Sequence, residues 1–318
     1  MRSQAATKND SVRQVDKFRK LARYVIEHHF GNRPARIGYK AGGLSNFVFE
    51  AKHAEGDFIV RISPDKARLN AFIKDHWCER AARKAGVPTA EILETGASII
   101  PFPYVIARSV TGIEGVNHPE RVRITHELGR MAAKINSIKT RGFGETFDWS
   151  NNELSRNADL KEYLEGEYGY EARIEALDRS GLVPSPTLKA LGRIMRELSK
   201  KKARPVLNRG DMRLKNVLAD EAGTIVAVID WEDATSNIAP QWELSFALHE
   251  LGIDGEQQFV EGYGIAPKKL TDIGPYIRAF NLLNYKDEVE RATSAKDKPA
   301  IARLKARFAG DLDLYSIC

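Results

Sequence analysis

The segment 207–233 limits what this chain can fold into more than any other part of the sequence. Residues 224–229 are a β-branched run of strand length that follows a Glu-Ala-Gly turn, and residues 217–218 precede that turn as a short apolar pair. The pattern therefore predicts a β-hairpin. Asn216 directly precedes the first strand and Asp230 directly follows the second, so we expect these two side chains to lie close together across the hairpin.

Asp211 lies five residues before Asn216 and completes a D-x-x-x-x-N…D array. A protein kinase catalytic loop has this spacing, because phosphoryl transfer needs one carboxylate to accept the proton of the attacking hydroxyl and further oxygen ligands to hold Mg²⁺. In this interpretation Asp211 is the catalytic base, and Asn216 and Asp230 bind the metal. The alternative is that Asn216 caps a turn, Asp211 lies in a loop and Asp230 merely ends a buried strand.

The segment resembles the aminoglycoside phosphotransferase and choline kinase superfamily, in which H-G-D-x-x-x-x-N is followed by I-D-W-E. The Trp231-Glu232 pair separates this family from ordinary protein kinases, and the resemblance covers about residues 36–250. It implies an α+β, two-lobed, protein-kinase-like fold with a small antiparallel-sheet amino-terminal lobe and a larger, mainly helical carboxyl-terminal lobe. It also implies Mg²⁺ and a nucleotide donor, which is ATP with GTP as an alternative.

Gly42 and Gly43, with Ser45 and Asn46, resemble the nucleotide loop of that family. Glycine lacks the Cβ that would keep backbone amides away from phosphate oxygens. A plain hairpin turn explains two glycines equally well. The chain has no G-x-x-x-x-G-K-[ST] motif, which disfavours a P-loop enzyme.

Arg61 stands where kinases carry a Lys that contacts the α- and β-phosphates, and a guanidinium can bind such groups bidentately. We expect its partner to be Glu79 on the following helix, with Asp75 one turn earlier as the alternative. The competing interpretation is a surface Arg and a solvated Glu. In the resembling family, backbone groups of the hinge contact the adenine, which implies Ala107 and Ser109 here.

Two departures from the family pattern concern the catalytic loop. Arg209 replaces the family's His two residues before the base, and it either braces the loop or pairs with Asp211 or Asp230 and reduces activity. The segment 237–244 lacks the first Asp of the family's Gly-Asp-Pro-x-x-Asp-Leu sequence. Glu243 is expected to take the role of its scaffold carboxylate.

Hydrophobic periodicity and turn signals predict the domain organisation. In chain order it consists of a basic amphipathic helix (1–34), a nucleotide-binding lobe (35–108), a hinge (109–116) and a catalytic and substrate lobe (117–318). The nucleotide-binding lobe should contain three strands within 35–63, a helix to about residue 85, and strands near 91–96 and 103–108. The predicted buried stripe of that helix consists of Leu69, Phe72, Ile73 and Trp77.

The net charge of +6 is concentrated at the amino terminus, where residues 1–35 contain eight basic and three acidic side chains. A solvated helix face explains this better than a nucleic-acid or membrane contact. No stretch approaches the roughly 20 apolar residues of a membrane helix, and the first residues lack a signal-peptide core. Cys78 and Cys318 lie far apart and suggest neither a disulfide framework nor a zinc site. We therefore expect a cytoplasmic monomer or homodimer.

These features favour a small-molecule kinase that phosphorylates a hydroxyl of an aminoglycoside-like or other hydroxylated molecule, with antibiotic resistance as one biological role. Acidic side chains within residues 153–178 lie near several tyrosines and could bind a cationic substrate, although solvated helix faces look the same. One alternative is a catalytically impaired, kinase-like nucleotide-binding protein, suggested by Arg209. Another is a basic RNA-associated module.

Overall fold

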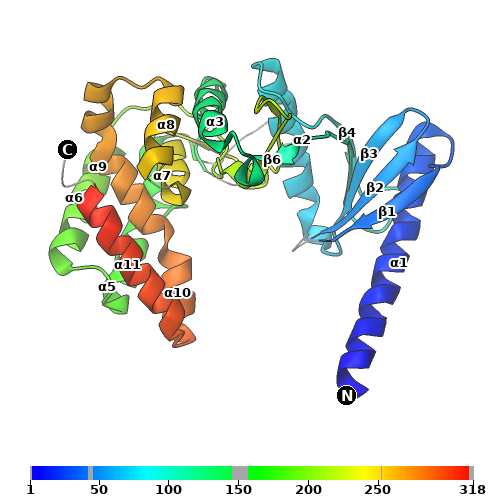
Figure 1. The fold of residues 1–318 in the computed structure, drawn as a ribbon. Coiled ribbons are helices and arrows are strands. Elements are labelled where there is room, and N and C mark those ends of the chain that lie inside the picture. The colour runs from blue at the N-terminus through cyan, green and yellow to red at the C-terminus, as the bar shows by residue number, and fades with distance from the viewer. Residues whose placement is uncertain (1, 42–45, 145–156, 252, 315–318) are drawn as a thin grey trace. The chain divides into compact units, whose positions relative to one another are not determined.

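The computed structural model describes residues 2–41, 46–144, 157–251 and 253–314, and it divides into two compact units (Figure 1). Unit 1 consists of Met1–Ile113, Val217–Glu221 and Ile225–Glu232. Unit 2 consists of Glu114–Asn216, Ala222–Thr224 and Asp233–Cys318.

Unit 1 is built on a five-stranded antiparallel sheet with the strand order β1-β2-β3-β5-β4. The strands are β1 (Arg36–Lys40), β2 (Phe47–His53), β3 (Gly56–Ile62), β4 (Ile92–Gly96) and β5 (Tyr104–Arg108). All five were expected from the sequence, and β2, β3 and β5 contain continuous runs of β-branched and aromatic residues that favour strands. The predicted antiparallel sheet is confirmed.

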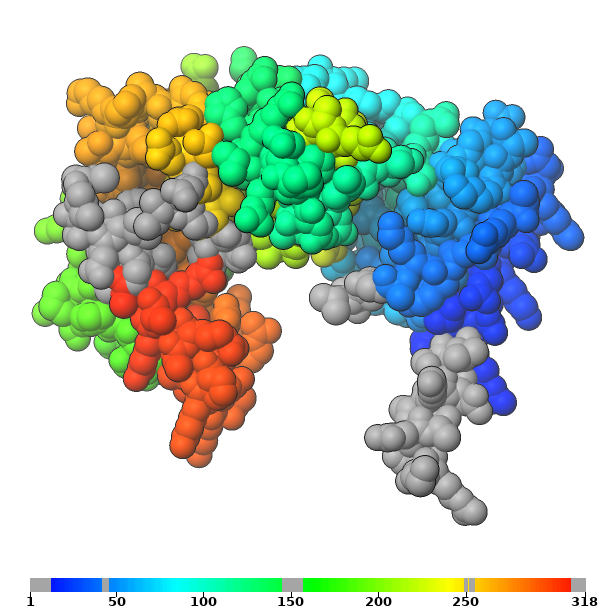
Figure 2. Space-filling model, viewed as in Figure 1, coloured from blue at the N-terminus to red at the C-terminus, as the bar shows by residue number. Residues whose placement is uncertain are grey.

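Helix α1 (Arg2–Phe30) packs against this sheet through its predicted apolar face. Phe18, Ala22 and Val25 are buried in one cluster with Phe49 and Phe58 of the strands. In the space-filling view the dark blue part of α1 lies directly against the lighter blue strands (Figure 2). The amino-terminal helix is therefore part of unit 1.

Helix α2 (Leu69–Lys84) follows the 3-10 turn η1 (Lys66–Arg68), and its buried face differs from the predicted stripe. Leu69, Ile73 and Trp77 are only half-buried. The residues that α2 buries are Phe72, Asp75, Cys78, Glu79 and Ala82. The face of α2 that packs inward therefore includes Asp75 and Glu79 rather than the predicted apolar stripe. Both carboxylates have polar partners elsewhere in unit 1.

The predicted hairpin is formed by β8 (Val217–Ala219) and β9 (Ile225–Val228), in a sheet with the order β6-β8-β9. The two-residue strand β6 (Ile113–Glu114) was not predicted. Val228 N donates to Pro88 O at 2.8 Å, which attaches the hairpin to the segment before β4. Although the sequence analysis assigned the hairpin to the carboxyl-terminal lobe, these contacts make it part of unit 1.

Unit 2 is mainly helical, as expected. Its helical elements are η2 (Gly115–Asn117), α3 (Arg121–Ile135), α4 (Leu160–Glu165), α5 (Tyr170–Ser180), α6 (Ser185–Ser199), η3 (Leu214–Asn216), α7 (Gln241–Glu250), α8 (Ile253–Tyr263), α9 (Pro267–Asn284), α10 (Lys286–Ser294) and α11 (Lys298–Leu314). Two short strands, β7 (Val206–Asn208) and β10 (Thr235–Asn237), pair antiparallel. Within the described ranges, none of the helices combines the length and apolar character that crossing a bilayer demands.

Candidate active site

Asp211 lies in unit 2, in the loop between β7 and η3, and donors surround its carboxylate. Asn216 Nδ2 donates to Asp211 Oδ2 at 2.7 Å and to Asp211 O at 3.1 Å. Arg213 Nη2 donates to the same Oδ2 at 2.5 Å, and Arg213 Nε pairs with Oδ1. The expected base and the expected amide ligand are therefore in direct contact. The sequence analysis did not identify Arg213.

A buried carboxylate holds the backbone of this loop. Glu243, in the first turn of α7, accepts hydrogen bonds from Arg209 N at 2.6 Å and from Gly210 N at 3.2 Å. Gly210 has a φ of 76°, and a Cβ at this position would lie 2.4 Å from Asp233 O, so the loop requires glycine. Burial raises the pKa of Glu243, and the two amides oppose that shift because they stabilise the anion. These contacts match the scaffold role expected for Glu243.

The side chain of Arg209 is 0% exposed and contacts Asp211. Its Nη1 donates to Asp211 O and lies 3.6 Å from Asp211 Oδ2. Both a contact with the loop backbone and an ion pair with the Asp211 carboxylate are thus present.

Asp230 follows β9 in unit 1 and has a φ of 64°, which is uncommon for a non-glycine residue but tolerated best by Asp and Asn. Val217 pairs with Val228, so the end of β9 lies beside the start of β8, the strand that Asn216 directly precedes in the chain. The charge of Asp230 also contributes to raising the pKa of Asp75, after burial as the main cause. Asp230 and Asp75 therefore interact electrostatically within unit 1.

Arg61 pairs with Asp75, and the expected pairing with Glu79 is wrong. Arg61 Nη2 donates to Asp75 Oδ2 at 2.7 Å, and the Asp75 side chain is only 2% exposed. Glu79 instead accepts from Thr89 Oγ1 at 2.6 Å and from Ile92 N at 3.4 Å, and it pairs with Arg83 Nε at 3.2 Å. Glu79 lies one turn further along α2, and it fixes the start of β4 rather than the end of β3.

Most of the expected nucleotide loop, namely Gly42, Gly43 and Ser45, lies outside the described residues. Asn46 is half-buried, and its Oδ1 accepts no hydrogen bond from the part of the chain that the structure describes. Val48 pairs with Arg61, so Asn46 and Arg61 are positioned at the same end of the β2–β3 pair. The described end of the loop is thus placed beside the expected phosphate-binding side chain.

The expected hinge residues lie at the end of β5. Ala107 is buried between two strands, opposite Ile59 in β3 and Ile92 in β4. Ser109 N donates to Asp57 O at 2.8 Å, so this amide is already used inside unit 1.

The acidic residues expected to attract a cationic substrate are Glu162, Glu165, Glu167, Glu171, Glu175 and Asp178, and all six are exposed. Some of them also serve local structure. Glu162 Oε2 accepts from Ala158 N at 2.7 Å, and Glu167 Oε2 accepts from Asn157 Nδ2 at 2.8 Å. Glu162 and Glu167 therefore use their carboxylates in local hydrogen bonds, and only part of this acidic set could serve a substrate alone.

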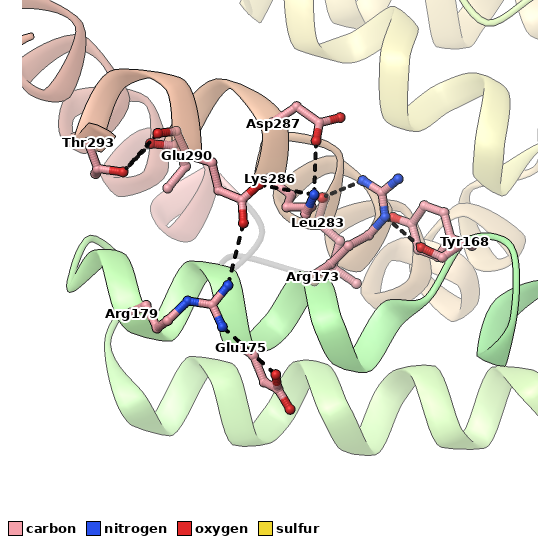
Figure 3. Close-up of polar contacts among 10 residues, drawn as sticks. Tyr168, Arg173, Glu175, Arg179, Leu283, Lys286, Asp287, Glu290 and Thr293 are labelled. Atoms are coloured by element: carbon pink, nitrogen blue, oxygen red, sulfur yellow. Dashed lines mark hydrogen bonds and ion pairs between the residues drawn. The ribbon is translucent and has the colours of Figure 1, made fainter. Parts of the chain in front are cut away.

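Arginines of α5 attach that helix to α9 and α10 (Figure 3). Arg173 Nη1 donates to Leu283 O at 3.2 Å, and its guanidinium lies 4.3 Å from the centroid of the Tyr168 ring. Arg179 Nη2 pairs with Glu290 Oε1 at 3.4 Å. The helix that carries the exposed carboxylates of α5 is therefore anchored to α9 by Arg173 and to α10 by Arg179.

Two charged residues near the expected site escaped the sequence analysis. Arg213 lies two residues after Asp211 in the same loop. Its positive charge so close to a carboxylate could have predicted an ion pair. Arg68 pairs with Glu232 in unit 1, and these residues are 164 positions apart in the chain. No local pattern could have identified that second pair.

Comparison with known proteins shows the family and the fold. A family model described as the phosphotransferase enzyme family matches residues 40–278. No curated protein sequence matches the chain.

Solved structures share the fold. A thermostable mutant of aminoglycoside phosphotransferase APH(4)-Ia, in a ternary complex with ADP and hygromycin B, is 17% identical with a TM-score of 0.65, over 92% of this chain and 97% of that chain. Macrolide 2′-phosphotransferase MphH from Brachybacterium faecium is 13% identical with a TM-score of 0.57, over 93% and 98%. The GDP complex of a mutant aminoglycoside 2′-phosphotransferase-IIIa is 15% identical with a TM-score of 0.61, over 91% and 95%. The fold is therefore the kinase-like α+β fold of aminoglycoside phosphotransferases.

Proposed function

Because this chain belongs to the phosphotransferase enzyme family, we propose that it transfers the γ-phosphoryl group of ATP or GTP to a hydroxyl of a small molecule. The contact between Asn216 Nδ2 and Asp211 Oδ2 at 2.7 Å carries the proposal. It joins a carboxylate that can accept a proton to an amide whose oxygen can bind a cation. Phosphoryl transfer needs both functions from this loop.

Asp211 is the proposed general base. A carboxylate offers about four lone-pair sites, and Arg213 and Asn216 use about three of them. About one site on Oδ1 is left for a substrate hydroxyl. Arg209 and Arg213 orient the carboxylate, so that the base is held in one position before the acceptor binds.

Asn216 and Asp230 are the proposed ligands of Mg²⁺, and their chemistry fits that ion because Mg²⁺ prefers oxygen ligands. Asn216 Nδ2 already donates to Asp211, so Asn216 Oδ1 is the atom of this amide that can ligate a cation. Asp230 supplies a carboxylate. When bound, the ion would neutralise charge on the nucleotide phosphates.

Gly42, Gly43, Ser45 and Asn46 are proposed to hold the phosphates through backbone amides, and Arg61 through its guanidinium. The described part of this set supports the proposal, because Asn46 and Arg61 lie at one end of the β2–β3 pair. One structural relative was solved with ADP and another with GDP, so both donors belong in the test.

The proposed acceptor is an aminoglycoside-like or other hydroxylated small molecule. One structural relative was solved with hygromycin B and another is a macrolide 2′-phosphotransferase. The exposed carboxylates Glu165, Glu171 and Asp178 support a cationic acceptor, because their charge would attract amino groups.

The test measures nucleoside diphosphate release from ATP and from GTP over a panel of aminoglycosides, macrolides, amino alcohols, sugars and amino acids, with mass spectrometry of each product. At least one panel member should gain a phosphoryl group. With that acceptor, Asp211→Asn should lower turnover about 10²- to 10⁴-fold while nucleotide affinity stays nearly unchanged. Near-normal turnover in Asp211→Asn would remove Asp211 from the role of base.

A catalytically impaired, nucleotide-binding protein is the second candidate. The observation in its favour is that Arg209 and Arg213 both contact the carboxylate of Asp211 and compete with a substrate proton for it. This candidate predicts that the parent protein binds nucleotide with Mg²⁺ but phosphorylates no member of the panel. It also predicts that Arg209→His releases activity.

A further inference from the structure

Asn136, directly after α3, connects two parts of unit 2 through its amide. Its Nδ2 donates to Leu207 O at 3.0 Å and to Glu243 Oε2 at 3.3 Å, while its Oδ1 accepts from Tyr263 OH at 2.8 Å. Leu207 belongs to β7, the strand that leads into the catalytic loop. Asn136 is 9% exposed, so these groups are its principal partners among the described residues.

The partners determine which way this amide points. Leu207 O and the Glu243 carboxylate only accept hydrogen bonds, so they require the NH₂ group of Asn136. The hydroxyl of Tyr263 then donates to the oxygen on the other side. Burial and the charge of Glu243 both raise the pKa of Tyr263, which keeps its hydroxyl protonated and able to donate.

Tyr263 is held in place because α3 and α8 approach each other at two glycines. A Cβ at Gly129 would lie 2.1 Å from Phe259 O, and a Cβ at Gly262 would lie 1.8 Å from His126 O. The two helices are therefore in backbone contact, and the residue after Gly262 is Tyr263. An interface packed this closely leaves little freedom for the ring to move.

We propose that Tyr263 and Asn136 are positioning residues for phosphoryl transfer, because they fix the Glu243 carboxylate that holds the amides of Arg209 and Gly210. The proposal rests on the proposed function. Glu243 Oε2 accepts from both Arg209 N and Asn136 Nδ2, so rotation of the Asn136 amide would present an oxygen to an oxygen. The carboxylate would then turn away, and the loop that carries the base would loosen.

The experiment compares hydrogen exchange at the Arg209 and Gly210 amides in the parent, Tyr263→Phe and Tyr104→Phe. Tyr104 is a matched control, because its buried hydroxyl donates to Glu94 Oε1 and both residues belong to unit 1, whereas the loop belongs to unit 2. Tyr263→Phe should raise exchange at these two amides about two- to tenfold, the effect of losing one hydrogen bond. Tyr104→Phe should leave it unchanged. Equal exchange in the parent and Tyr263→Phe would overturn the proposal.

Asn136→Asp is the stronger variant, because it places a second carboxylate against Glu243. It should raise hydrogen exchange at the Arg209 and Gly210 amides more than Tyr263→Phe does. If Asn136→Asp does not fold, Tyr263→Phe alone tests the positioning role. With a confirmed acceptor, Tyr263→Phe should lower kcat several-fold and leave nucleotide affinity unchanged. Faster exchange with unchanged kcat would overturn the positioning role. A parent without turnover would refute the proposed function, whereas the exchange data would still show whether Tyr263 holds the loop.

Discussion

Replacing Asp75 tests the ion pair that the structure assigns to Arg61. Asp75 is almost fully buried, and the Arg61 side chain is 21% exposed. Burial raises the pKa of Asp75 even though Arg61 opposes the shift, so desolvation of this carboxylate outweighs the attraction of its partner. Three variants separate the contributions: Asp75→Asn, Asp75→Ala and Glu79→Gln.

Asp75→Asn keeps an oxygen for Arg61 Nη2 and removes the buried charge, so it should lower the free energy of unfolding by only about 1 kcal/mol. Asp75→Ala leaves Arg61 without its carboxylate in a partly buried place and should cost about 3 kcal/mol. An Arg61 side chain released from Asp75 must lose rotamer freedom when it binds phosphate, about 0.5 to 1.5 kcal/mol. The Kd for nucleotide should therefore rise about two- to tenfold in Asp75→Ala.

The assays are urea unfolding and calorimetric titration with ADP and GDP. Glu79→Gln is the control, because it leaves the contact between Arg61 and Asp75 intact and should keep the Kd for nucleotide within about twofold. If Glu79→Gln weakened nucleotide binding as much as Asp75→Ala, the pairing of Arg61 with Asp75 would not be the one that serves the nucleotide. Unchanged affinity in Asp75→Ala would refute the reasoning altogether.

Three further predictions concern the metal and the catalytic loop. Asp230→Ala should abolish the Mg²⁺-dependent part of nucleotide affinity in calorimetry, because the ion loses a carboxylate ligand; equal Mg²⁺ dependence in parent and variant would exclude this ligand. Arg209→Ala should lower kcat more than nucleotide affinity, while Arg209→His should preserve turnover, and an active parent unaffected by Arg209→Ala would exclude the bracing role. Since the pKa of Glu243 is raised, its contribution to stability is present below the usual Glu range and is lost as pH rises through the raised pKa. The unfolding free energy of the parent relative to Glu243→Gln should therefore fall with rising pH in that window, and a rise would contradict it.

The strands of unit 1 and the hairpin of β8 and β9 could be predicted because their signals are local. The run at residues 224–229 and the turn before it specify a hairpin with little help from the rest of the chain, and the structure contains it as β8 and β9. Its membership of unit 1 could not be predicted, because the hydrogen bond from Val228 to Pro88 joins segments 140 residues apart. The short strands β6 and β10 have no sequence pattern of their own and exist through their partners.

The inward face of α2 could not be derived from apolar periodicity. A pattern of Leu69, Phe72, Ile73 and Trp77 describes an amphipathic helix well, and periodicity assigns acidic residues to the solvent side. The structure buries Asp75 and Glu79 because each has a specific partner on a distant strand or loop. The choice of Glu79 for Arg61 failed for this reason, since the phase of the helix depends on contacts that the sequence does not show.

Burial of a carboxylate is unfavourable unless hydrogen bonds or an opposite charge compensate it, so each buried acid in this chain needs an explanation. Asp75 holds the cationic side chain of Arg61, and Glu243 holds two amides beside the proposed base. Glu79 is equally buried, and its partners are Thr89, Ile92 and, at 3.2 Å on the same helix, Arg83. Burial alone therefore does not identify a functional acid. The place of the partner does, because Arg61 and the amides of Arg209 and Gly210 belong to the proposed site, whereas the partners of Glu79 belong to α2 and to the segment that leads into β4.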